Sequence, residues 1–161
     1  MKATGIVRRM DELGRIVIPR EIRKNLRIRH GEPMEIYTTS EGEVVFRKYS
    51  PFASLPQVVS DMVAQLHQVS RCNVVACDRE KVIAAAGPDK IDWLNIDVPA
   101  AWQTAMEARK SAEVEGWRLV PIMDDGDVPG CLAFEASTPY PDAAGQLARF
   151  CADLISKVLE V

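Results

Sequence analysis

The sequence predicts an α+β protein built from two folded domains, residues 1–50 and 57–161, joined by a linker over 51–56. The charge distribution is the first observation behind this division. Residues 1–50 carry 11 basic and 7 acidic side chains, whereas residues 51–161 carry 9 and 16, so the formal charge changes from +4 to −7. The second observation is the break at 50–56, where two prolines and two serines interrupt the hydrophobic periodicity.

The N-terminal domain is predicted to have the order β-β-α-β-β. Strand-forming residues flank a turn at 11–14, and Pro19 is favourable at the start of a helix, where its missing N–H costs nothing. Ile22 and Leu26 lie four positions apart, on one face of that helix. The predicted strands cover 3–9, 15–18, 34–39 and 43–49, and the predicted helix covers 20–26.

Residues 1–50 contain only 19 apolar side chains, and a domain of this size has difficulty building a core of its own. A homodimer with interleaved strands would let two such domains share one apolar layer. The candidates for this shared core are the β-branched and leucine side chains of the predicted strands and helix: Ile6, Val7, Ile16, Val17, Ile18, Ile22, Leu26, Ile36 and Val45.

The first 29 residues carry nine basic and three acidic side chains, and a dimer would double this excess of positive charge. Such a cluster is typical of a surface that binds the phosphate backbone of a nucleic acid. Because proteins that read single-stranded RNA display aromatic stacking platforms, and residues 1–29 hold no aromatic side chain, the composition favours duplex DNA.

The segments TGIVRRMDELGRIVIPREIRKNL (4–26) and GEPMEIYTTSEGEVVFRKYSP (31–51) resemble the AbrB family of swapped-hairpin DNA-binding proteins. The resemblance implies a homodimer of interdigitated hairpins whose basic residues contact DNA. By position, the residues implied are Arg8, Arg9, Arg15, Arg23 and Lys24; charge and placement add Arg20 and Lys2. Since the helix is short and Asn25 is its only side-chain amide, we expect specificity to come from DNA shape.

The second domain is predicted to have the order α-β-β-α-β-β-α, which fits an antiparallel sheet with helices packed against it. Val59, Met62, Val63, Leu66 and Val69 form the apolar face of its first helix. The predicted elements are helix 57–69, strands 73–78 and 81–87, helix 99–110, a hairpin over 117–137 and helix 141–161.

The segments CDREKVIAAAG (77–87) and LVPIMDDGDVPGCLAFEAS (119–137) are similar to the GAF sensor domain. Together with the AbrB-type N-terminus, they resemble a family of sporulation-stage transcription regulators that join the same two modules. The resemblance implies a small-molecule ligand, whereas the short segment 111–116, where a fuller GAF domain has a longer insert, argues against a ligand cavity. The apolar faces of 57–69 and 144–161 are wider than one small sheet requires, which predicts a homotetramer through 57–161.

Other classes of function find little support in the residues. No catalytic motif is present, so we expect neither an enzyme nor a cofactor, and no apolar run is long enough to span a membrane. The four cysteines lack the close pairing of a zinc site, which predicts buried reduced thiols and no metal. The three tryptophans are expected in core or interface packing, with a ligand pocket as the less favoured alternative.

These observations predict a cytoplasmic, nucleoid-associated transcription regulator that binds double-stranded DNA as a homo-oligomer. Two alternatives stay open. The chain could be an antitoxin, since related swapped-hairpin domains serve in antitoxins, although these usually append a short disordered tail. It could also be a ligand-binding sensor that does not bind DNA.

Overall fold

The structure, a computed structural model, describes residues 3–160 and consists of two units divided between Tyr49 and Ser50. The N-terminal unit comprises α1 (Arg20–Asn25), β1 (Met34–Thr38) and β2 (Val44–Lys48). The C-terminal unit comprises η1 (Pro51–Ser54), α2 (Pro56–Ser70), β3 (Val74–Asp78), β4 (Val82–Ala86), α3 (Lys90–Trp93), α4 (Ala100–Glu107), β5 (Ala112–Val114), β6 (Trp117–Asp124), β7 (Asp127–Glu135) and α5 (Pro141–Leu159). Among the helices of the described residues, none is long and apolar enough to span a membrane.

In the N-terminal unit the second predicted hairpin is confirmed. β1 pairs antiparallel with β2 in a register that runs from Met34 opposite Lys48 to Thr38 opposite Val44. α1 starts at Arg20, and Pro19 is its N-cap rather than its first helical residue. The turn at 11–14 also forms, because the Gly14 N–H donates to the carbonyl of Asp11.

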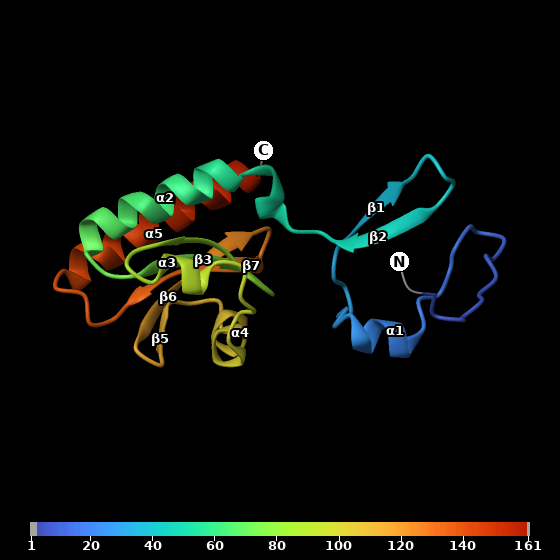
Figure 1. The fold of residues 1–161 in the computed structure, drawn as a ribbon, viewed down its shortest axis with the longest axis horizontal. Helices are drawn as coiled ribbons and strands as arrows, with labels where there is room; N and C mark the ends of the chain where they lie inside the picture. Colours follow the sequence, from blue (N-terminus) through green and yellow to red (C-terminus); the bar gives the residue numbers. More distant parts are fainter. Residues whose placement is uncertain (1–2, 161) are drawn as a thin grey trace. The chain divides into compact units, whose positions relative to one another are not determined.

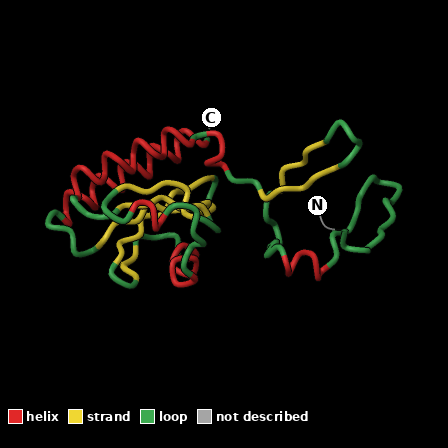
Figure 2. The backbone as a smooth tube through the Cα atoms, viewed as in Figure 1, coloured by secondary structure: helices red, strands yellow, loops and turns green. Residues whose placement is uncertain are grey.

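The prediction of strands over 3–9 and 15–18 is wrong for a single chain. Both segments are drawn as loop in Figure 2, and among the described residues neither joins a sheet. A strand is defined by its ladder of hydrogen bonds, and β-rich composition without a partner strand leaves an extended segment. The described residues 3–49 include no buried side chain, so this unit has no core of its own in a single chain.

The C-terminal unit is a five-stranded antiparallel sheet in the order β4-β3-β7-β6-β5, with helices on both faces. Figure 1 shows α2 and α5 side by side over one face, whereas α3 and α4 lie at the other. Side chains alternate between the faces, as the pleat of a strand requires. Val74 and Ala76 of β3 pack under α2 and α5, whereas Val75 and Cys77 face α3 and α4.

Three features of this unit differ from the sequence predictions. The helix α3 and the edge strand β5 were not predicted, because four and three residues are too few to show a periodicity. The segment predicted as a linker, 51–56, is folded: η1 packs Phe52, only 3% exposed, into the core beneath α2. Burying the apolar side chain of Phe52 lowers the free energy of the folded state, and this favours a packed segment over a solvated linker.

The predictions that the cysteines are buried thiols and that the tryptophans pack in the core are confirmed. All four cysteines are buried free thiols, and Cys77 and Cys131 lie opposite each other on β3 and β7 with their Sγ atoms 3.3 Å apart. Trp102 of α4 is 1% exposed and its ring lies 5.7 Å from that of Trp93 and 5.3 Å from that of Trp117. The three rings therefore fill the space between α3, α4 and the sheet.

Candidate nucleic-acid interface

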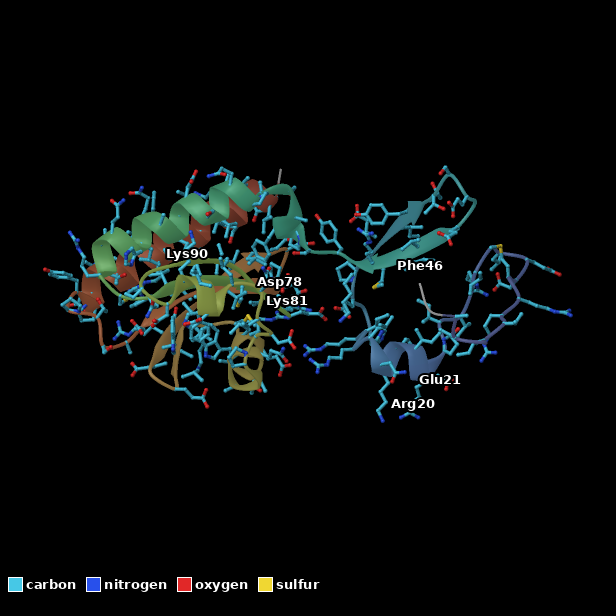
Figure 3. All side chains as sticks on the ribbon, in the orientation of Figure 1. Arg20, Glu21, Phe46, Asp78, Lys81 and Lys90 are labelled. Atoms are coloured by element: carbon cyan, nitrogen blue, oxygen red, sulfur yellow. The ribbon has the colours of Figure 1, made fainter. Side chains whose placement is uncertain are left out.

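A hollow of about 580 Å³ beside the first turn of α1 gathers three of the predicted basic residues. Arg20 and Lys24 come from α1, and Arg8 comes from the extended segment before the 11–14 turn. Val17, Pro19 and Glu21 complete the lining. Since Arg20 and Lys24 are four positions apart on the helix, their side chains project from the same face. Figure 3 labels Arg20 and Glu21 at this end of α1.

The charge of this hollow favours an anion. Three cations face one carboxylate, that of Glu21, so the lining carries a net positive charge. All three cations are exposed, which leaves their charged groups in solvent and accessible to a partner. A hollow with several accessible cations is suited to a phosphate backbone, in which the charges are closely spaced.

Arg15 is held in place by the turn that precedes it. Its Nε–H donates to Asp11 Oδ2 at 2.7 Å, and its backbone N–H donates to Asp11 Oδ1 at 2.8 Å. These hydrogen bonds lower the pKa of Asp11, because they stabilise its charged form. One edge of the Arg15 guanidinium is thus bound within the protein, and its remaining N–H groups point away from this contact.

The predicted DNA-binding residues separate into groups. Arg8, Arg20 and Lys24 share the hollow, whereas Arg9, Arg15 and Arg23 are exposed but do not line it. Lys2 lies outside the described residues.

Sequence reasoning missed two acidic members of this region. Glu21 lines the hollow, and Asp11 orients Arg15. The spacing between Asp11 and Arg15 across a predicted turn was a signal that could have found the second of these. Glu21 follows Arg20 directly, but only the tertiary arrangement directs it toward the same hollow.

The N-terminal unit also exposes much of its predicted dimer core. Val7 is 84% exposed, Val17 71% and Ile36 62%, all far above what a finished core shows. Such a collection of exposed apolar side chains on one small unit marks an interaction surface.

In the described part of the chain, no group of three or more His, Cys, Asp or Glu side chains could hold a metal ion. The turn between β6 and β7 carries Asp124, Asp125 and Asp127, and the last of these is paired with a basic residue. There Arg79 forms an ion pair with Asp127, and its Nε–H donates to the carbonyl of Val128 at 2.9 Å.

Comparison with known proteins agrees with both halves of this description. Residues 54–160 match the family model described as "Stage V sporulation protein T C-terminal, transcription factor". Stage V sporulation protein T of Bacillus subtilis (strain 168) is 45% identical over 148 residues, which cover 82% of this chain and 83% of that protein. The transition state regulatory protein AbrB of the same organism is 51% identical over 51 residues, or 32% of this chain and 52% of that protein.

Among solved structures, the GAF domain from Acinetobacter phosphoenolpyruvate-protein phosphotransferase aligns with a TM-score of 0.53 at 13% identity. The alignment covers 70% of this chain and 83% of that one, which shows the GAF-like fold of the C-terminal unit. The predicted fold class is therefore confirmed: an AbrB-type N-terminal region precedes a GAF-like domain with an antiparallel sheet. The chain belongs to the stage V sporulation protein T family of transcription regulators, a family of sporulation-related transcription factors and not of enzymes.

Proposed function

We propose that this chain regulates transcription by binding duplex DNA through the basic residues of its N-terminal unit. The observation that carries the proposal is the hollow that Arg8, Arg20 and Lys24 line together. Arg9, Arg15 and Arg23 add exposed positive charge to the same unit, and Lys2 adds charge at its terminus.

The contacts proposed here are mainly to phosphates, so they position the protein without reading base edges. α1 has six residues and presents Asn25 as its only amide side chain. Specificity then comes from the cost of fitting a particular DNA sequence to the protein surface, which depends on groove width and deformability.

We further propose that the functional unit is a homo-oligomer. In the N-terminal unit, a second copy would supply the missing strand partners of 3–9 and 15–18 and would cover Val7 and Val17. In the C-terminal unit, Phe150 of α5 is 60% exposed and Val158 41%, which supports a second contact and a closed tetramer.

Fluorescence anisotropy of a labelled A/T-rich duplex, titrated at several salt concentrations, tests this function. We expect log affinity to fall steeply and linearly with log salt concentration, as multiple phosphate contacts require. Absence of binding at low salt would refute the DNA-binding function and favour the sensor that does not bind DNA. A monomer mass in light scattering at micromolar concentration would refute the oligomer.

Small-molecule sensing by the C-terminal unit is a second candidate function. It is favoured by a cleft in this unit, between α5 and the sheet, that two arginines line. The antitoxin alternative is not retained, because residues 50–160 form a folded GAF-like unit in place of the short disordered tail expected of an antitoxin. A cytoplasmic, nucleoid-associated location follows from the proposed binding to DNA.

A further inference from the structure

A cleft of about 410 Å³ lies in the C-terminal unit between α5 and the β5–β6 edge of the sheet. Its volume falls within the range of roughly 300–1,000 Å³ that small-molecule sites occupy. Its lining residues come from four elements and the loop before β5: Ser111, Ala112, Glu113, Arg118, Leu119, Val120, Phe134, Gly145 and Arg149. The cleft therefore combines charged groups at its sides with apolar side chains from the sheet.

Two guanidinium groups face the same position above Gly145. A Cβ atom built on Gly145 would lie 3.6 Å from Arg118 Nη1 and 3.9 Å from Arg149 Nη2. One phosphate or carboxylate group placed between these nitrogens could accept hydrogen bonds from both. Glycine is a poor residue for the interior of a helix, and here its missing side chain keeps this space open.

The charges around the cleft do not balance. Arg118 lies near the Glu113 carboxylate, with 3.8 Å between Nε and Oε2, and its Nη1–H donates to the carbonyl of Pro141 at 3.4 Å. Within the described part of the chain, Arg149 has no hydrogen bond or ion pair. Two cations thus face one carboxylate, and Arg149 retains all its donors for a ligand.

We propose that this cleft binds a small organic anion, with its phosphate or carboxylate group between Arg118 and Arg149 and its apolar part against Val120 and Phe134, which face α5. The inference rests on sensing as the second candidate function and names its ligand class. Arg149 directly precedes the exposed Phe150, so the proposed ligand site adjoins the part of α5 that we propose as an oligomer contact.

Calorimetric titration of the full chain with phenyl phosphate tests the proposal, with inorganic phosphate as the comparison probe. We expect phenyl phosphate to bind more tightly, since its ring reaches the apolar floor. Arg149→Gln should weaken binding at least tenfold by removing one of the two donors. Lys157→Gln, which removes the same charge from an exposed position on the same helix, should leave the affinity unchanged.

Gly145→Ala separates loss of binding from loss of folding. The added Cβ makes only ordinary van der Waals contacts with the arginines, and alanine favours the helix, so the thermal midpoint should not fall. The methyl group nevertheless occupies the place of the anion, so the affinity for phenyl phosphate should fall at least tenfold. Unchanged affinity in both Arg149→Gln and Gly145→Ala would overturn the proposal and assign any residual phosphate binding to the basic N-terminal unit.

Two further measurements ask separately whether the cleft is a ligand site and whether ligand binding there affects DNA binding. If Arg149→Gln lowers the mass of the oligomer without ligand, Arg149 belongs to an interface between copies and the ligand proposal is wrong. If phenyl phosphate binds at the cleft, DNA affinity measured with and without it then tests sensing. An unchanged DNA affinity would refute sensing while supporting the cleft as a binding site.

Discussion

The hollow beside α1 makes a quantitative prediction about Lys24→Ala. Lys24 lines the hollow with an exposed ammonium group, and its proposed role is one phosphate contact. Each lost contact lowers the slope of log affinity against log salt by about 0.9, so a homodimer that loses two contacts should show a slope smaller by about 1.8. When salt rises from about 50 to 200 mM, the fold-loss of DNA affinity in the variant should therefore be roughly ten times smaller than the fold-loss in the unmodified protein.

The assay is fluorescence anisotropy with a labelled duplex over that salt range, with the oligomer mass measured in parallel. Lys90→Ala removes the same charge from an exposed position in the C-terminal unit and should leave the slope unchanged. Glu21→Gln removes the carboxylate that lines the hollow among the described residues and should strengthen binding. A slope in Lys24→Ala equal to that of the unmodified protein, with the oligomer intact, would refute the assignment of this hollow to phosphate contacts.

Three further predictions concern stability and ionisation. In Gly130→Ala, the added Cβ would lie 2.0 Å from the carbonyl oxygen of Cys77 on the paired strand. Urea unfolding should therefore show that the free energy of unfolding falls by about 3 kcal/mol or more. An unperturbed midpoint would contradict this packing. Trp102→Ala should cost about 3–5 kcal/mol in the same assay because it empties the centre of the tryptophan cluster, whereas a loss under about 1 kcal/mol would show that the cluster is not part of the core. The stabilising contact between Asp11 and Arg15 is fully present above pH 3.8, the ordinary pKa of an aspartate, and is lost as the pH falls through the lowered pKa of Asp11. The NMR shift of the Arg15 Nε–H should therefore titrate with a midpoint below pH 3.8. A midpoint at or above 3.8 would be inconsistent with the hydrogen bonds described.

Local patterns were sufficient for elements whose partners lie nearby in the chain. The β1–β2 hairpin was predicted because two segments rich in strand-forming residues flank a short turn, and that pairing forms within one chain. The helices α2 and α5 were predicted because each is long enough to display a complete apolar face. In contrast, 3–9 and 15–18 have the composition of strands, but no strand in the described part of the chain pairs with them.

The candidate site shows the same division. The basic residues could be identified from charge and from the AbrB resemblance, because both are properties of the chain read in order. Which of them meet could not be identified this way. Arg8 joins Arg20 and Lys24 because the segment after it reverses direction at the Asp11 turn, and this reversal brings residues distant in sequence to one hollow.

The sequence by itself determined the two-domain organisation, the charge contrast between the domains, the family and the main helices. The family followed from the resemblance of its sequence motifs, and the rest depends on composition and on contacts between close neighbours in the chain. The tertiary structure decided that Phe52 is a core residue rather than part of a linker, and that three tryptophans meet at one face of the sheet. It also decided that Arg118 and Arg149 flank the space left by Gly145. These arrangements join residues from separate elements, and only the packing of a strand against a helix brings such residues within contact distance.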